Sequence, residues 1–188
     1  MVRESPEGFD GHWDVHMCQT CYKVPGHWCF AFWCPCVFVC LQRSRVIEGD
    51  WEHQYRCCQG YYGGCFDSCT KPCPRCCMCV EAVICTWCSI FGNRASLQDR
   101  YQIANTKCEN AILCLACVCS WVRCIVSIFV NIPDAVDCAI DCLYCALSAC
   151  LQAQQEHELD VREGGAPSLK PPREIHVEEG IPMEEIKK

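Results

Sequence analysis

Two long helical segments joined by a short turn constrain the fold of this chain more than any other feature. The first covers residues 111–130 and is largely apolar. It ends at the sequence NIPD, where Pro133 stops one helix and Asp134 can cap the next. The second segment keeps a helical pattern over residues 135–160. Two helices with so short a connection form a hairpin. The sequence therefore predicts a mainly α fold, a helical hairpin with an irregular cysteine-rich N-terminal half.

Cysteines recur on one face of each hairpin segment. Cys114 and Cys117 share a face with Trp121, and Cys142 and Cys145 share a face of the second segment, because residues three, four or seven apart lie above one another on a helix. Antiparallel packing could bring the two pairs together as ligands of one ion. Alternatively, they are small apolar core residues, because free cysteine is among the most buried residue types. The sequence leaves both interpretations open.

The chain contains 25 cysteines among 188 residues. The start, MVRESPEGFDGHWDVH, is polar and lacks the apolar stretch of an export signal. We therefore expect thiols that face the cytosol or another reducing compartment, where disulfides are rare. An odd number of cysteines also excludes complete pairing within the chain. Dense reduced thiols favour metal ligation or lipid acylation.

Zinc is the metal that these thiols suit best, because it binds tetrahedrally to thiolates and imidazoles, and CxxC supplies two ligands from one turn. One candidate site combines two cysteine pairs of the N-terminal half with His27 as a spare ligand, and the other combines the two pairs of the hairpin. Irregular spacing leaves an iron–sulfur cluster, core packing and acylation open. A redox-active CxxC is less favoured, because no βαβ pattern surrounds the motif. The predicted metal ligands are Cys18, Cys21, Cys34, Cys36, Cys114, Cys117, Cys142 and Cys145.

The apolar run 111–130 also raises the question of a membrane. It is long enough to span a hydrocarbon core of about 30 Å, but it contains Arg123, which costs roughly 2.5–3.5 kcal/mol near the centre of a bilayer. Asp137 and Asp141 on the second segment could pair with this arginine or forbid insertion. We expect a hairpin that dips into the membrane or a membrane-associated surface. An inserted hairpin would keep both its ends in the cytosol.

Several function classes are disfavoured. The net charge is −7 and the basic residues are scattered, so we expect no nucleic-acid partner. None of the motifs GxGxxG, P-loop, GxSxG or HExxH occurs, so we expect no enzyme and assign no catalytic residue. Glu156 and Glu158 beside His157 are expected to form a solvated helix end.

The composition divides the chain into three parts. Residues 1–17 are a polar lead-in, residues 18–162 form the cysteine-rich domain, and residues 163–188 form a disordered acidic tail. The tail has Gly-Gly and Pro-Pro but no cysteine or aromatic residue, so it cannot bury a core. Within the domain, residues 93–103 also predict a short amphipathic helix.

Three segments carry a family resemblance. HWCFAFWCPC (residues 27–36) resembles the CxxxxCPC element of the placenta-specific-8 family, which includes plant cadmium-resistance and cell-number-regulator proteins. The family often has a cysteine doublet first, and Trp28 replaces one member here. NRASLQDRYQIANTKCENAILC and CLYCALSACLQAQQEHELD resemble its basic helix and its closing helix. The resemblance covers residues 13–160. The block 57–88 is longer and richer in cysteine than the family pattern.

The resemblance implies membrane association, with links to heavy-metal handling or to control of cell number, and it brings no settled catalytic residues. We therefore expect a non-enzymatic, membrane-associated module that binds structural zinc and acts as a regulatory or scaffolding component with protein partners. Two alternatives stay open: a component of zinc or cadmium transport, and an accessory subunit of a large membrane assembly. A homo-oligomer is also left open.

Overall fold

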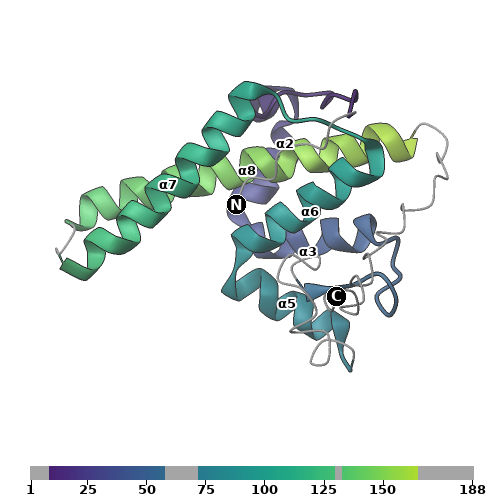
Figure 1. Cartoon of the computed structure of the whole chain (residues 1–188), viewed down its shortest axis with the longest axis horizontal. Coiled ribbons are helices and arrows are strands. Elements are labelled where there is room, and N and C mark those ends of the chain that lie inside the picture. The colour runs from purple at the N-terminus through teal and green to yellow at the C-terminus, as the bar shows by residue number, and fades with distance from the viewer. Residues whose placement is uncertain (1–8, 58–71, 130–132, 165–188) are drawn as a thin grey trace, which may run out of the picture.

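The computed structural model describes residues 9–57, 72–129 and 133–164. The prediction of a mainly α fold with a helical hairpin is confirmed (Figure 1). Within these ranges, the one isolated β-bridge joins Gly11 to Ile103. In chain order the elements are η1 (Met17–Gln19), α1 (Thr20–Lys23), α2 (Pro25–Trp33), α3 (Pro35–Val46), α5 (Pro74–Ile84), α6 (Thr86–Tyr101), α7 (Lys107–Phe129) and α8 (Asp134–Gly164).

Three helices of the cysteine-rich half begin at a proline: Pro25 in α2, Pro35 in α3 and Pro74 in α5. Proline suits the first helical position because its fixed φ is already helical and its missing N–H is not needed there. The residue before a proline is pushed out of the helical region. Cys34 and Cys73 accordingly have φ of −133° and −149° and are the N-caps of α3 and α5. This half of the chain is therefore a series of short helices, and the CPC sequence is a break between two of them.

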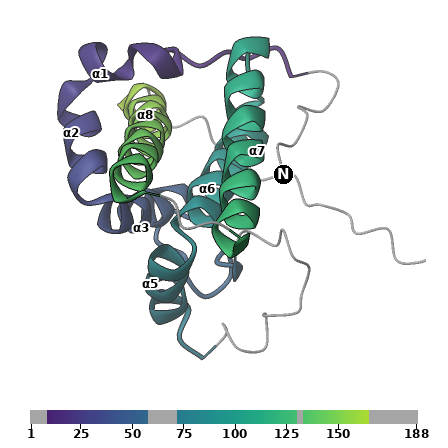
Figure 2. The same cartoon turned by 90° about the vertical axis from the view of Figure 1, so that its left-hand side faces the viewer.

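The second half of α8 forms the centre of the body. Figure 2 shows α8 nearly end-on, with α1 and α2 on one side, α3 below it and α6 on the other side. Leu151 and Leu159 are fully buried there. Leu151 belongs to the main apolar cluster, which also contains Val39 of α3, Met78 of α5 and Ile90 of α6. The body is thus several short helices wrapped round one long helix.

The described part of the predicted polar lead-in packs against this body. Trp13, Val15 and Met17 are buried. Gly11 donates its N–H to the carbonyl oxygen of Gln102 at 3.0 Å, and its own carbonyl accepts from the N–H of Ala104 at 2.8 Å. Residues 9–17 therefore contribute to the core of the domain.

The hairpin agrees with the sequence prediction in order and approximate bounds. The segments predicted over 111–130 and 135–160 are α7 and α8, and each helix is longer than predicted at the end away from the turn. The helix predicted over 93–103 is the second half of α6, which starts earlier, at Thr86, because the apolar residues before Asn93 continue the helix into the core. Residues 130–132 of the turn, residues 1–8 of the lead-in and residues 165–188 of the predicted tail lie outside the described residues.

Across residues 9–57, 72–129 and 133–164, no single helix meets the length and hydropathy expected of a membrane span. The bent pair α5 and α6 meets these criteria when taken together, with an angle of 118° between the two helices. Both helices contribute to the core, through Met78 and Ala82 of α5 and Ile90 and Leu97 of α6.

Candidate interaction arm and cysteine sites

The outer parts of α7 and α8 extend away from the body (Figure 1). We call residues 114–129 of α7 and 134–146 of α8 the arm. Figure 2 shows that α7 and α8 stand apart from each other. Side chains bridge them: the hydroxyl of Tyr144 on α8 donates to the carbonyl oxygen of Ala116 on α7 at 3.0 Å. Tyr144 also packs edge-on against Trp87 of α6, with ring centroids 5.9 Å apart.

The arm exposes large apolar side chains along one side of α7. Trp121 is 71 % exposed, Ile128 72 % and Phe129 79 %. At about 100° per residue, the exposed set spans roughly 160° of the helix surface. A contiguous exposed apolar surface of this kind marks a site of protein or membrane contact. On α7 the set is Leu115, Val118, Trp121, Val122, Ile125, Val126, Ile128 and Phe129.

The one basic residue of this part of α7 lies on the opposite side and is paired. Arg123 donates to Asp137 at 2.7 Å and to Asp141 at 2.5 Å, both on α8. These contacts, the hydrogen bond to Asp141 first, raise the pKa of Arg123. The sequence left open whether Asp137 and Asp141 pair with Arg123 or forbid membrane insertion, and the structure shows the pairing. The two aspartates therefore connect α8 to α7 through exposed ion pairs.

The cysteines predicted to form a metal site on the hairpin lie mostly at the surface. Cys114, Cys142 and Cys145 are exposed, and Cys117 is half-buried. Exposure argues against a core role for the first three. Within the described ranges, no group of three or more His, Cys, Asp or Glu side chains is arranged to hold a metal ion. The hairpin set therefore does not fit a zinc ion in this arrangement, and zinc stays a prediction from the sequence.

The N-terminal candidate set is also spread over different surroundings. Cys18, Cys21 and Cys34 are exposed, whereas Cys36 is half-buried with its Sγ 3.7 Å from Oγ1 of Thr86. His27, the spare ligand in the sequence prediction, instead lies 3.0 Å from a carboxylate oxygen of Asp160.

Cys18 has neighbours that its spacing in the sequence does not indicate. Its pKa is raised by burial and then by the nearby thiols of Cys108 and Cys150. Cys150 in turn accepts a hydrogen bond from Nε1 of Trp28 at 3.3 Å. Cys18 is therefore close to Cys108 of α7 and to Cys150 of α8.

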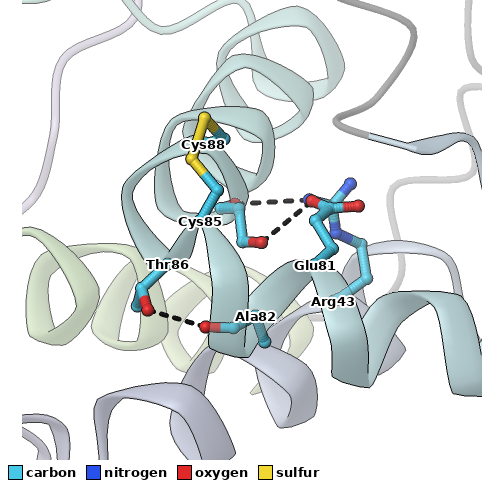
Figure 3. Close-up of a disulfide and its surroundings, with 7 residues drawn as sticks. Arg43, Glu81, Ala82, Cys85, Thr86 and Cys88 are labelled. Atoms are coloured by element: carbon cyan, nitrogen blue, oxygen red, sulfur yellow. Dashed lines mark hydrogen bonds and ion pairs between the residues drawn. A yellow bond between two sulfur atoms is a disulfide. The ribbon is translucent and has the colours of Figure 1, made fainter.

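One CxxC motif is oxidised. Cys85 and Cys88 form a disulfide, with their Cα atoms 5.4 Å apart (Figure 3). Cys85 is the N-cap residue of α6, and Cys88 lies in the first turn of that helix. None of the eight predicted metal ligands takes part in this disulfide. In the loop-closure model, a loop this short stabilises the fold by only about 2 kcal/mol, through the lower entropy of the unfolded chain. The disulfide therefore contributes little to stability.

A buried ion pair lies directly beside the disulfide. The side chain of Arg43 is fully buried and donates to Glu81 at 3.4 Å. Glu81 also accepts hydrogen bonds from the hydroxyl of Tyr55 at 3.0 Å and from Oγ of Ser89 at 2.9 Å. Burial and the charge of Glu81 raise the pKa of Tyr55, which keeps it a donor. This network links α3, α5 and α6.

A second buried network links α6 to α7 and α8. Arg94 donates to Oδ1 of Asn105 at 2.6 Å and to Oε1 of Gln154 at 2.7 Å, and its guanidinium lies 4.2 Å from the ring centroid of Trp13. Burial lowers the pKa of Arg94 to about 10. Gln154 also donates to Glu109 at 2.7 Å. The network therefore joins segments that are far apart in the sequence.

Glu109 is the anion of this second network. Burial alone would raise its pKa, but hydrogen bonds from Gln154 and from the N–H of Thr106, together with the charge of Arg94, lower it. Sequence reasoning missed both networks. The sequence feature that indicates buried polar contacts is the run of Gln and Glu at residues 152–158. From the sequence, Glu156 and Glu158 are instead interpreted as part of a solvated helix end. Glu156 and Glu158 are in fact buried, with Glu158 accepting from the N–H of Asp14 at 2.9 Å, so that expectation is wrong.

Comparisons of the chain with protein families, with characterised proteins and with solved structures gave no match.

Proposed function

We propose that this protein is a non-enzymatic, membrane-associated, cysteine-rich module of the placenta-specific-8 type. The arm contacts the membrane, and the body is a scaffold that presents surfaces to protein partners. The observation that carries the proposal is the apolar outer face of α7, which includes Trp121, Ile128 and Phe129.

The arm is suited to lie in the plane of the membrane interface. An interfacial helix buries its apolar face about 5–10 Å into the boundary between headgroups and acyl chains and keeps its polar face in water. The exposed apolar arc of α7 is opposite Arg123, so the arc can enter this boundary while the charged residues stay on the aqueous side. Trp121 lies within the arc, and tryptophan is enriched at such interfaces.

The length of the arm supports a shallow position. Its α7 part, residues 114–129, is about 24 Å long at 1.5 Å per residue, which is less than the roughly 30 Å of a hydrocarbon core. The pairing of Arg123 with Asp137 and Asp141 lowers the cost of bringing these charges close to the membrane, because the three groups carry one net negative charge.

Flotation of the full chain with vesicles of phosphatidylcholine and phosphatidylserine tests the proposal. We expect the protein to float with the vesicles. Changing Ile128→Glu places a carboxylate in the apolar face and should reduce the vesicle partition coefficient about tenfold, which corresponds to ~1.4 kcal/mol.

Ile84→Glu is the matched control. Ile84 is an isoleucine on α5 with an exposed fraction of 79 %, compared with 72 % for Ile128, but it lies outside the arm. Its substitution should leave flotation unchanged. Equal losses in the two variants, or a wild-type protein that does not float, would contradict the proposal. In the second case, elution of the protein from detergent extracts in a large particle would favour an accessory subunit of a membrane assembly.

A further inference from the structure

The position of the disulfide between Cys85 and Cys88 suits a reactive pair of thiols better than a bond that stabilises the fold. The two cysteines are three residues apart in the sequence, so the bond closes a very small loop inside the first turn of α6 (Figure 3). The entropic stabilisation that a disulfide provides grows with the length of the loop it closes. This bond therefore adds little to the stability of the fold.

The helix terminus also makes the pair reactive in thiol exchange. Cys85 is the N-cap residue of a 16-residue helix, and Cys88 is three positions further on. Cys85 is also the C-cap residue of α5, with its N–H donated to the carbonyl oxygen of Glu81 at 2.8 Å. The positive end of the α6 dipole therefore acts mainly on Cys88, in the first turn of α6, where it stabilises the negative charge of a thiolate. A stabilised thiolate is a good leaving group, so a disulfide at this place is opened readily by another thiol.

The pair is accessible to a small reagent. Cys85, Thr86, Trp87 and Cys88 are all half-buried, so none of them is sealed inside the core. A free thiol, Cys36, lies next to the same turn, with its Sγ 3.7 Å from Oγ1 of Thr86.

The turn that carries the disulfide is joined to the buried ion pair of the body. Ser89, which follows Cys88, donates through Oγ to Glu81 at 2.9 Å, and its carbonyl oxygen accepts from Arg43 at 3.3 Å. Figure 3 shows Arg43 and Glu81 beside the first turn of α6. The disulfide therefore closes a turn that contacts this ion pair, at the 118° bend between α5 and α6.

We propose that Cys85 and Cys88 form a reversible dithiol–disulfide site that exchanges with small thiols of the glutathione class. A glutathione thiolate attacks the Sγ atom of one cysteine, the bond between the two cysteines breaks, and the other sulfur leaves as a thiolate that takes up a proton. A second glutathione thiolate then attacks the mixed disulfide and releases glutathione disulfide and the second cysteine thiolate, which is protonated. Two glutathione molecules are oxidised, and the cysteine pair gains two electrons and two protons. This inference does not rest on the proposed function.

Equilibration of the full-length protein in buffers of graded glutathione to glutathione disulfide ratio tests the site. Acid quenching, alkylation and peptide mass spectrometry give the fraction of each cysteine that is reduced. We expect Cys85 and Cys88 to change together as one two-electron couple. The control is Cys142/Cys145, a free and exposed CxxC in the interior of α8, far from a helix N-terminus. It should stay reduced at ratios at which the α6 pair is mostly oxidised, because Cys142 and Cys145 are free thiols in the structure whereas Cys85 and Cys88 are bonded.

Single substitutions sharpen the test. Cys88→Ser should leave Cys85 as a single thiol that is trapped as a mixed disulfide with glutathione, whereas Cys145→Ser should leave Cys142 largely unmodified in the same buffer. Should Cys88→Ser fail to fold, the wild-type titration still decides. The proposal is overturned if Cys85 and Cys88 stay reduced at every ratio, stay oxidised at every ratio, or oxidise at the same ratio as Cys142 and Cys145.

Discussion

The two halves of α8 lie in opposite environments. In the body, the second half buries polar side chains such as Gln154, Gln155 and Glu158. In the arm, the first half and its neighbour α7 expose apolar side chains such as Leu143 and Trp121, which are 70 % and 71 % exposed. A soluble helix usually shows the reverse distribution, with polar residues outside and apolar residues inside.

The difference indicates separate roles for the two regions. Buried polar groups are tolerated only when they are hydrogen-bonded, and such networks fix one arrangement of the surrounding helices. In the body, the network of Arg94, Asn105, Glu109 and Gln154 joins helices that local sequence does not bring together. In the arm, exposed apolar groups contribute little to folding and remain available for contact. The body therefore specifies structure, and the arm is the surface from which we infer function.

Removing the centre of the buried network is expected to have the largest effect. Changing Arg94→Met leaves Glu109 as a buried charge without its cation and should lower the free energy of unfolding by about 3–5 kcal/mol. Urea denaturation followed by circular dichroism measures this change. The control is Arg100→Met, which removes an ion pair with Glu48, a residue whose side chain is 63 % exposed, and should cost only about 0–1 kcal/mol. Similar losses in the two variants would show that the network does not hold the body together.

The contact of the lead-in with the body gives the next effect. A Cβ atom at Gly11 would lie 2.8 Å from the carbonyl oxygen of Gln102, a backbone atom that cannot turn away. Gly11→Ala should therefore lower the free energy of unfolding by about 1–3 kcal/mol. Gly26→Ala in α2 is the control, because a Cβ there meets nothing within 4 Å, and alanine in a helix should stabilise by about 0.5–1 kcal/mol. A Gly11→Ala protein as stable as the wild type would mean that residues 9–17 are not part of the folded body.

Acid should weaken the body through Glu109. The pKa of this carboxyl is lowered below its ordinary value of 4.5 in the folded state, so its contribution to stability is complete above about that pH and is lost as the pH falls through the folded pKa. Charged hydrogen bonds of this kind contribute about 1.5–3 kcal/mol. Urea midpoints measured from pH 6 down to pH 3 should therefore fall less steeply in Glu109→Gln than in the wild type. Identical slopes in the two proteins would assign the acid sensitivity to other carboxyl groups.

The sequence predicts the body and the arm unequally. Local signals were sufficient for the hairpin, since Pro133 and the apolar pattern before it mark the end of α7 and the start of α8. The pairing of Arg123 with Asp137 and Asp141 could also be anticipated, because these residues face each other across a hairpin. Features that depend on residues close together in the chain could therefore be predicted from the sequence.

Features that depend on residues far apart in the sequence could not be predicted from it. Glu158 is buried because the N–H of Asp14 and the side chain of Arg162 meet its carboxylate, and residue 14 is remote from it in the sequence. Trp13 is buried under Arg94 for the same reason. The cysteines show a further limit, since a spacing such as CxxC is compatible with a metal ligand, a disulfide or an exposed thiol. Only the environment distinguishes Cys85, which is bonded to Cys88, from the free thiol of Cys142.

The smallest effect is expected at the arm cysteines, where the zinc prediction can be decided. Cys142 is exposed, so Cys142→Ser should change the free energy of unfolding by less than about 0.5 kcal/mol, as surface substitutions usually do. A zinc ligand would behave differently, because structural zinc contributes roughly 10–16 kcal/mol of apparent binding free energy in small domains. Elemental analysis of protein purified under reducing conditions, together with urea denaturation with and without a chelator, measures the contribution of metal. If zinc is present at one ion per chain and both chelation and Cys142→Ser unfold the protein, α7 and α8 must come closer together than they stand in Figure 2, and the arm would be a metal-stabilised part of the body.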